Sequence, residues 1–460
     1  MNFENNLTSP GIELDAESDD YKTLTSHISK ILSKIKRKLE GIADAGKMNF
    51  HLNDFKLHYN ERFPGAMVIS LSMNKRDMTD ISVLSENHKD YLVCLKSDGI
   101  RFLLAILNDG RFYLIDRNSK YFQIDTFING DLFYENKKNL EIVYLFDGEL
   151  IMGLAGKVKR HFQIFDVILF DKKLKISQDY VCRLKICEKF LKQVKFLNDF
   201  VKPTDHSKNG LAGEDKILVT IKDFYKCNEI DFVLNKLGKL KLYEEKIDGV
   251  IFTKIDYPYV PGRNKGIVKW KPDYLNSIDF LAVENKTIMS KYLPGQENDA
   301  FKVFEMFVMR ANQLLLFDYF FINDDKVYNE ICSQTQEMNI LGKTINGAIL
   351  EANYDREYKN ITLTEFYRNT FKLDFDRMLD LIEYSQLGKE AVNDTNAVYT
   401  LTKNLEKRFN IVTKEVKGNW NYLRVRTDKI LPNGFGTARN VNSTIFEENI
   451  SQEALIKSLS

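Results

Sequence analysis

The first candidate catalytic residue in this sequence is a lysine that is followed within five residues by an aspartate, a glycine and an arginine. Lys96 opens the segment Lys-Ser-Asp-Gly-Ile-Arg, which ends at Arg101. A lysine is a poor nucleophile while it is an ammonium ion, so an enzyme that uses one must lower the pKa of its amine by burial and neighbouring positive charge. Arg101 and the later lysines would supply that charge. A Lys-x-Asp-Gly tetrapeptide alone also suits a surface turn, so the prediction depends on the residues further along the chain.

Further charged and aromatic residues occur after Lys96 at the ends of predicted strands or inside them. In chain order they are Arg117, Asp147-Gly148-Glu149, Phe165-Asp166, Asp248 and Ile251 within the run from Lys246 to Phe252, Lys269-Trp270-Lys271-Pro272, Asp279, and Arg424 to Lys429 with Asp428. Lys269 and Lys271 are two residues apart, so on a strand both point to the same face. Two like charges held side by side favour a polyanion such as a triphosphate, although a solvated strand edge also explains a pair of lysines.

Each of these residues has a plainer interpretation. Phe165 and Ile251 suit a hydrophobic core. Glu149 and Asp248 stand beside glycines at strand boundaries, where turns favour such residues anyway. Cys94, two residues before Lys96, is expected to be only a small buried residue.

The elements that must position these residues are short apolar runs separated by turn signals, from about residue 63 to 285. Strands are predicted at 91–95, 102–107, 112–115, 142–146, 162–170, 217–221, 250–253 and 267–270. The sequence Asn-Asp-Gly-Arg at 108–111 predicts a hairpin. Helices are predicted at 24–42 and 184–200. The pattern favours an α+β fold with a mostly antiparallel sheet and helices on its flanks.

The last third of the chain has a different pattern. Apolar runs at 301–309, 313–322 and 347–352 predict short strands that suit a small barrel. Residues 363–410 have a helical pattern, and strands are expected again at 411–416 and 422–426, around a turn at 417–419. We expect this region to be a separate domain.

Composition excludes several classes of protein. The 460 residues carry a formal net charge of +1, which argues against bulk attraction to nucleic acid or membrane. The five cysteines form no close metal-binding pairs, which favours a reduced compartment. The first twenty residues hold six acids and no lysine or arginine, unlike a signal peptide. The basic residues from Lys30 to Lys38 suggest a solvated helix face or a contact for RNA or an acidic partner.

Taken in order, these motifs resemble the GTP:RNA guanylyltransferases of eukaryotic mRNA capping. That family belongs to the lysine-dependent covalent nucleotidyltransferases, which also include ATP-dependent DNA ligases and RNA ligases. The resemblance covers 63–280 and resumes at 346–352 and 420–429. Phe63-Pro64-Gly65 and Pro258-Tyr259 are similar to the fungal, monofunctional type, and Arg-x-Asp-Lys at 426–429 is more capping-like than ligase-like. Ser97 stands where the family more often has threonine.

The resemblance implies a nucleotidyltransferase domain of the ATP-grasp-like DNA ligase and capping enzyme type, succeeded by an oligonucleotide-binding (OB-fold) barrel. The expected divisions are a flexible acidic tail at 1–20, the nucleotidyltransferase domain at 21–280, the barrel at 281–440 and a helical tail at 441–460. A helical insertion at about 355–410 would interrupt the barrel. This stretch is longer and more helical than the resemblance to the family leads us to expect.

The resemblance also implies a role for each site residue. Lys96 would attack the α-phosphate of GTP, release pyrophosphate and hold GMP as a phosphoramidate, which the 5′-diphosphate end of RNA then takes to form the GpppN cap. Arg101, Lys269 and Lys271 would stabilise phosphate charge. The remaining roles are Arg117 and Glu149 at the ribose, Phe165 and Ile251 around the guanine, Glu149, Asp248 and Asp279 near the metal, and Arg424, Asp428 and Lys429 at the departing pyrophosphate.

By the same resemblance the cofactor is Mg²⁺ or Mn²⁺, and the enzyme acts in the nucleus. Its partners would be 5′-diphosphate RNA, a separate RNA 5′-triphosphatase and the phosphorylated C-terminal tail of RNA polymerase II. No association with a membrane is expected. Two alternatives stay open. One is an ATP-dependent RNA or DNA ligase that uses the same lysine chemistry, and the other is a catalytically silent relative that only binds RNA or a polymerase tail.

Overall fold

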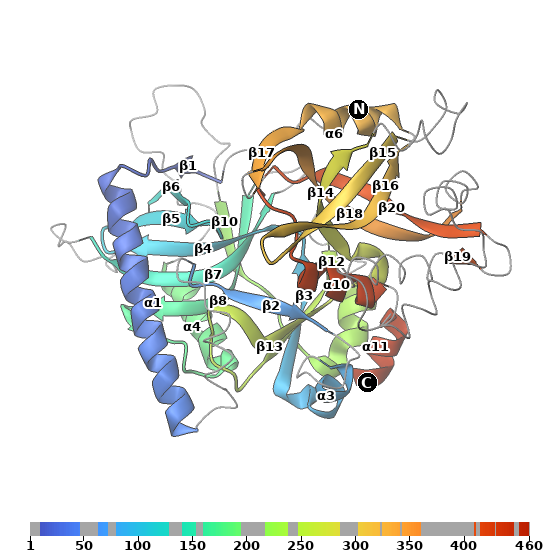
Figure 1. Ribbon diagram of the computed structural model, residues 1–460. Helices are drawn as coiled ribbons and strands as arrows, with labels where there is room; N and C mark the ends of the chain where they lie inside the picture. Colours follow the sequence, from blue (N-terminus) through green and yellow to red (C-terminus); the bar gives the residue numbers. More distant parts are fainter. Residues whose placement is uncertain are drawn as a thin grey trace. The chain divides into compact units, whose positions relative to one another are not determined.

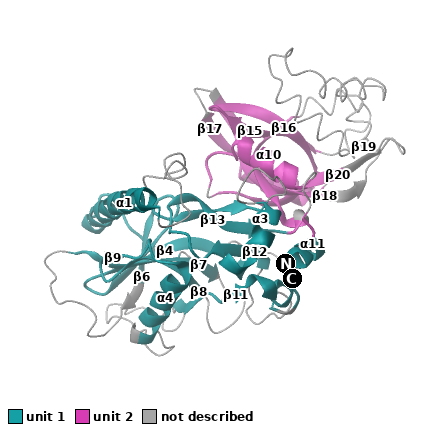
Figure 2. Ribbon diagram, turned by 90° about the horizontal axis from the view of Figure 1, so that it is seen from below, with its two compact units in different colours: residues 1–271, 452–460 teal, residues 272–451 magenta. Residues whose placement is uncertain are grey.

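The computed structural model describes fourteen ranges of residues, which fall into two compact units. The described ranges are 10–46, 63–71, 80–127, 140–152, 160–194, 217–237, 247–285, 302–322, 324–340, 343–359, 409–410, 415–427, 429–445 and 450–459. The first unit is Met1–Lys271 with Gln452–Ser460, and the second is Pro272–Ser451 (Figure 2). The division after Lys271 lies before the expected position 280.

Two mostly antiparallel sheets form the first unit (Figure 1). The larger has the order β1-β6-β5-β4-β7-β8-β10, with β9 on β8, and the smaller has the order β11-β3-β12-β13-β2. Their strands are β1 (Ile12–Glu13), β2 (Ala66–Ser70), β3 (Tyr91–Ser97), β4 (Ile100–Leu107), β5 (Arg111–Ile115), β6 (Tyr121–Phe127), β7 (Ile142–Met152), β8 (Arg160–Phe170), β9 (Lys173–Leu174), β10 (Ile217–Ile221), β11 (Tyr225–Lys226), β12 (Ile247–Lys254) and β13 (Gly262–Trp270). The helices are α1 (Asp19–Ala45), α3 (Ile81–Glu86), α4 (Tyr180–Val194) and α11 (Gln452–Leu459).

Helix α1 confirms the predicted amphipathic helix and extends it at both ends. The Ser18 side chain accepts a hydrogen bond from the Tyr21 backbone N–H, and two acids in the first turn suit the positive end of the helix dipole. The apolar face, with Leu24, Leu32 and Leu39 among its buried residues, packs into a core that includes residues of β4, β5 and β7. The basic residues from Lys30 to Lys38 lie on the exposed side.

The expectation of a flexible tail over residues 1–20 is wrong for the part that the structure describes. Ile12 and Glu13 form β1, which pairs with Gln123 and Phe122 of β6. Helix α1 already begins at Asp19, because Ser18 supplies a cap that apolar periodicity does not register. The predicted hairpin is confirmed: β4 and β5 are joined at 108–110, where Gly110 has a φ of 88°.

The second unit is built on an antiparallel sheet of order β16-β15-β14-β18-β20-β19, with β17 on β18. Its strands are β14 (Ser277–Glu284), β15 (Lys302–Arg310), β16 (Gln313–Ile322), β17 (Gln336–Ile340), β18 (Lys343–Lys359), β19 (Phe409–Asn410) and β20 (Glu415–Val425), and its helices are α6 (Asp325–Ser333) and α10 (Phe435–Ser443). The sheet curls so that the indole of Trp420 on β20 donates to Asp318 on β16 at 2.7 Å. Among the described strands no backbone hydrogen-bond ladder joins β16 to β20. The sheet is therefore curved as expected for an OB-fold, but the described strands do not close it into a barrel.

Two expectations for the second unit need correction. Residues 355–359, placed in a helical insertion, continue strand β18, whereas 360–408 lie outside the described residues. The predicted turn at 417–419 is an irregular point inside strand β20. Gly418 has a φ of 88°, and a Cβ there would lie 2.2 Å from the Tyr354 hydroxyl, so the glycine allows a bulge against a packed ring rather than a reversal of the chain.

The expected α+β fold with antiparallel sheets is confirmed. None of the helices in the described part of the chain is long and apolar enough to cross a membrane.

Candidate active site

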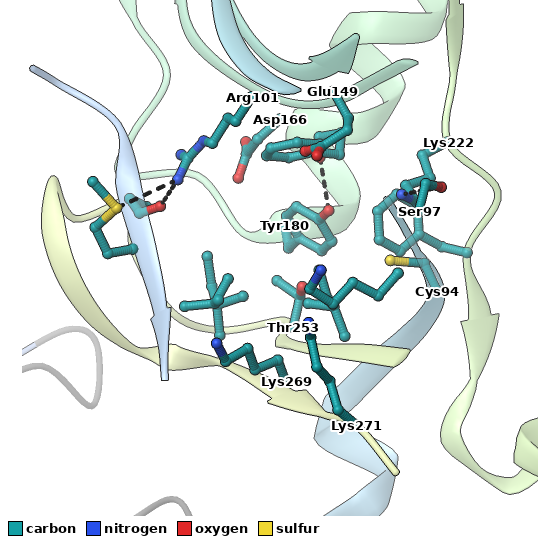
Figure 3. A pocket seen from close by; sticks show the side chains of 18 of the residues that line it. Cys94, Ser97, Arg101, Glu149, Asp166, Tyr180, Lys222, Thr253, Lys269 and Lys271 are labelled. Atoms are coloured by element: carbon teal, nitrogen blue, oxygen red, sulfur yellow. Dashed lines mark hydrogen bonds between the residues drawn. The ribbon is translucent and has the colours of Figure 1, made fainter. Parts of the chain in front are cut away.

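A pocket of about 290 Å³ in the first unit gathers most of the residues singled out in the sequence (Figure 3). The predicted residues that line it are Lys96, Arg101, Arg117, Glu149, Phe165, Ile251, Lys269 and Lys271. They come from β3, β4, β7, β8, β12 and β13 and from the residues just after β5 and β13. Segments up to 175 residues apart in sequence therefore meet at one cavity, counting from Lys96 to Lys271.

Strand register brings Lys96 and Lys271 to the same place on the smaller sheet. Lys96 pairs with Gly249 of β12, and Val250 pairs with Trp270, so the register brings Lys271 opposite the other side of Gly249. The Asp248 carboxylate lies 2.8 Å from the Lys96 amine and 2.5 Å from the Lys271 amine. One buried carboxylate therefore holds both amines beside the pocket.

The glycine between the two lysines is required by the backbone. Gly249 has a φ of 150°, at the edge of the region that favours glycine, and a Cβ on it would lie 2.1 Å from the Trp270 carbonyl oxygen. A side chain at this position would push β12 away from β13. Gly249 thus keeps Lys96 and Lys271 within reach of Asp248.

The pocket lowers the pKa of Lys269. Burial, together with the positive charges of Lys271 and Lys96, lowers the pKa of Lys269 to about 8, against the opposing effect of Asp248. The predicted crowding of cations is therefore present where Lys96, Lys269 and Lys271 meet. Cys94, which also lines the pocket, is a weak candidate for a nucleophile, because burial raises the pKa of its thiol to about 11.

Arg101 lines the pocket but is held firmly by the protein. Its Nε donates to Asp147 at 2.8 Å, a second guanidinium nitrogen donates to the same carboxylate, and a third donates to the Ala66 carbonyl oxygen. Burial alone would lower the pKa of Arg101, but Asp147 raises it above its usual range. This framework role is one that the sequence motif does not reveal.

Phe165 and Ile251 lie on the pocket wall and not inside the core. Both are only half-buried, whereas their strand neighbours Ile164 and Val250 are fully buried. Tyr180 and Phe224, which sequence reasoning missed, add two further rings to the wall and contact each other edge to face at 5.3 Å. The pocket therefore has the flat apolar surfaces that a nucleobase needs.

Lys222 and Ser97 form a hydrogen-bonded polar pair in the wall of the pocket. The Lys222 amine donates to the Ser97 hydroxyl at 3.0 Å, and Lys222 is only 9% exposed. Burial raises the pKa of Glu149, while Lys222 and Lys96 are the cations that oppose this shift most. Lys222 comes after strand β10 without any motif around it, so no sequence signal identifies it.

The C-terminal candidates belong to the second unit. Asp279 is buried, and its carboxylate binds Lys429 and, at 3.0 Å, Arg426. Arg424 instead pairs with Glu351 at 2.7 Å and is largely exposed. Arg426, absent from the predicted site residues, is thus the arginine that holds the buried carboxylate. Asp428 lies outside the described residues.

No group of three or more histidine, cysteine or acidic side chains suited to a metal ion occurs in the ranges that the structure describes. Of the three predicted metal residues, Glu149 and Asp248 belong to the first unit and Asp279 to the second. Two of the predicted carboxylates therefore belong to the unit that contains the pocket.

Two family models match this chain. A family model described as the mRNA capping enzyme, catalytic domain, matches residues 10–273, and one described as the mRNA capping enzyme, C-terminal domain, matches residues 368–456. Among the solved structures, "mycobacterial DNA ligase D complexed with ATP and MES" is 12% identical with a TM-score of 0.33, and the match covers 64% of this chain and 89% of that chain.

Curated relatives carry related names. The "mRNA-capping enzyme subunit alpha" of Schizosaccharomyces pombe is 28% identical over 59% of this chain and 66% of the relative. The protein of the same name in Yarrowia lipolytica is 29% identical over 48% of this chain and 53% of the relative. The chain thus spans about half to two thirds of the length of these relatives. Since the catalytic-domain model covers more than half of the sequence, this chain belongs to the mRNA capping enzyme family.

Proposed function

We propose that this protein is an mRNA guanylyltransferase, which transfers GMP from GTP through a covalent lysyl-GMP intermediate to the 5′-diphosphate end of RNA. The observation that carries the proposal is the Lys96 amine at the edge of a nucleotide-sized pocket, beside Asp248 and Lys271 and near Lys269. The relatives named mRNA-capping enzyme support the same reaction.

In the first step the Lys96 nitrogen forms a bond to the α-phosphorus as the bond to pyrophosphate breaks. The amine must lose a proton, and the Asp248 carboxylate, 2.8 Å away, is placed to accept it. Lys269 and Lys271 stabilise the charge that develops on the phosphate oxygens, as fixed cations do in phosphoryl transfer. In the second step an oxygen of the RNA diphosphate takes the GMP, and the Lys96 amine is released.

A divalent ion fits this pocket only together with the nucleotide. Mg²⁺ is usually bound by one or two carboxylates together with substrate phosphates and water. Asp248 and Glu149 are the carboxylates in the first unit that would hold it, and Mn²⁺ accepts the same oxygen ligands. The ion would supply further positive charge at the phosphates when bound.

The polar pair of Lys222 and Ser97 favours GTP over ATP. A lysine amine can only donate hydrogen bonds. The guanine base presents an acceptor oxygen at the position where adenine presents a donor amino group. If Phe165 and Ile251 hold the base between them, Lys222 and Ser97 are the polar groups in the pocket that would read that position. A buried donor there favours a guanylyltransferase over the ATP-dependent ligase.

The remaining assignments come from the family. Arg117 and Glu149 would contact the ribose, and Arg424, Asp428 and Lys429 of the second unit would orient pyrophosphate. The enzyme would act in the nucleus on 5′-diphosphate RNA, with a separate RNA 5′-triphosphatase and the phosphorylated tail of RNA polymerase II as partners. The residues up to about 271 would form the nucleotidyltransferase domain, and the second unit the OB-fold domain.

The nucleotide that stays on the chain tests the proposal. The protein is incubated with Mg²⁺ and either GTP or ATP labelled at the α-phosphate, then denatured and separated on a gel. We expect label from GTP and little or none from ATP. Label from ATP and none from GTP would establish the ligase alternative, and no label from either would support the silent relative.

A further inference from the structure

Two buried aspartates stand opposite each other at the pocket, and Asp166 is one of the residues that line it. Asp147 on β7 pairs in register with Asp166 on β8, and their exposed fractions are 0% and 2%. Two adjacent buried carboxylates are costly unless each has its own cation. Arg101 binds Asp147, with its Nε at 2.8 Å from one oxygen. Arg183 on α4 binds Asp166 through two nitrogens, at 2.7 and 3.2 Å.

The second ion pair is joined directly to the aromatic wall of the pocket. Asp166 is the next residue after Phe165, and the Tyr180 hydroxyl, at the start of α4, donates to the Phe165 carbonyl oxygen at 2.7 Å. On the other side, the Arg101 guanidinium lies 5.6 Å from the centre of the Phe165 ring. Phe165 is therefore held at its carbonyl, at the next residue and at its ring.

All the contacts described for the Arg183 guanidinium are with the protein interior, and Arg183 does not line the pocket. It is 2% exposed, and besides Asp166 it donates to the carbonyl oxygens of Gln178, at 2.5 Å, and Tyr257, at 3.2 Å. A guanidinium presents a planar fork that meets both carboxylate oxygens in one fixed orientation, whereas a lysine amine is a point charge on a flexible stem and does not fix that orientation. The geometry of Phe165 thus depends on a residue on a neighbouring helix.

We propose that Arg183 is a positioning residue for nucleotide binding, which fixes the base-binding face of Phe165 through the Asp166 carboxylate. This inference rests on the proposed function, because it takes Phe165 to be a wall of the guanine site. It predicts that loosening the Arg183 fork weakens GTP binding and base selectivity, while the covalent chemistry at Lys96 persists once the site is filled.

The Arg183→Lys variant tests the inference, with Arg111→Lys as its matched control. Arg111 also pairs with aspartates in the first unit, at 2.8 Å from Asp109, but it does not line the pocket. For Arg183→Lys we expect the KM for GTP in adduct formation to rise on the order of tenfold. The GTP-over-ATP preference should fall, and the fraction of chains labelled at saturating GTP should stay near that of the wild type. Arg111→Lys should lower the thermal midpoint without changing KM or preference.

A purely structural role predicts the reverse pattern. If Arg183→Lys lowers the thermal midpoint and the labelled fraction but leaves KM and base preference unchanged, the inference is overturned. If that variant does not fold, Tyr180→Phe decides, because it keeps the ring and removes only the bond to the Phe165 carbonyl. A raised KM for GTP would support the inference, and an unchanged KM would overturn it. Failure of the proposed function is a separate result, since the wild-type chain would then take no label from GTP.

Discussion

The Lys96 amine and the Asp248 carboxylate form an ion pair at 2.8 Å, and the same carboxylate binds Lys271 at 2.5 Å. In the proposed reaction the Lys96 amine must lose a proton before it attacks phosphorus, and Asp248 is placed to accept that proton. Asp248 has two further tasks in this arrangement. It balances the crowded lysines in the free enzyme and keeps the Lys96 amine at the edge of the pocket.

Removing the charge of Asp248 should therefore disable adduct formation. In Asp248→Asn the lysines lose their shared counter-charge and repel one another, and we expect the rate of covalent labelling to fall by about a hundredfold or more. The rate is measured by quenching labelled GTP reactions at short times. Asp109→Asn, which removes an ion pair with Arg111 outside the pocket, serves as the control. A rate for Asp248→Asn within a few-fold of the wild type would contradict this role.

Nucleotide binding should weaken as the pH rises through about 8. Lys269 is a cation below its lowered pKa of about 8 and neutral above it, so the attraction for phosphates present at pH 7 is lost on the alkaline side. Bound phosphate in turn favours the charged lysine, so binding at pH 8 should take up protons. Titration of GTP affinity from pH 7 to 9 measures both effects. The alkaline loss should be absent in Lys269→Arg, because arginine stays charged, and an equal loss in that variant would assign the effect to another group.

The same lowered pKa predicts a cost in stability. Between pH 8 and the ordinary lysine pKa of 10.5 the unfolded chain binds more protons at this position than the folded chain, so the contribution of Lys269 becomes less unfavourable as the pH rises. At pH 7 Lys269→Met should therefore raise the free energy of unfolding, by at most about 3 kcal/mol, while it weakens GTP binding. Urea unfolding at pH 7 measures the change. A less stable variant would contradict this interpretation.

A methyl group at position 249 should damage both the fold and the reaction. Gly249→Ala places a Cβ against the Trp270 carbonyl oxygen at a φ of 150°, so β12 and β13 must separate. We expect a loss of about 2–4 kcal/mol in the free energy of unfolding and little covalent label even in the folded fraction. Gly41→Ala on α1, where no atom lies within 4 Å of the new Cβ, is the matched control and should be neutral or stabilising. Chemical denaturation and gel labelling of both variants check this, and a Gly249→Ala protein as stable and as well labelled as the wild type would contradict it.

Base selectivity should depend on Lys222. In Lys222→Met the donor toward the base is lost while much of the side-chain volume is kept, so labelling by GTP should fall at least tenfold relative to labelling by ATP. The ratio of the two labelling efficiencies, measured at equal subsaturating concentrations, checks this. An unchanged ratio would place the base-reading group elsewhere.

Local patterns were enough to predict much of this site. The spacing of Lys269 and Lys271 predicts their shared face because a strand has a period of two, and the structure places both on the pocket wall. The hairpin at 108–110 results from the φ that Gly110 adopts. In both cases the relevant interaction is contained within a few residues.

The rest depends on contacts between distant segments. Lys222 is 125 residues from Ser97, and the fork of Arg183 is created by the way α4 packs beside β8. At Gly418 the sequence pattern predicted a turn that the fold does not make. The glycine does adopt a positive φ, but it packs against the Tyr354 ring and forms a bulge within β20. No spacing rule records such partners, so these residues become visible only in the fold.

The most direct test is to locate the covalent nucleotide on the chain. After incubation with GTP and Mg²⁺, the denatured protein is digested and the modified peptide is identified by mass spectrometry, in parallel with Lys96→Ala and Lys96→Arg variants. We expect one GMP on the peptide that contains Lys96 and none on either variant. GMP attached to another residue, or a Lys96→Ala protein that still becomes guanylated, would contradict the assignment of Lys96 as the nucleophile.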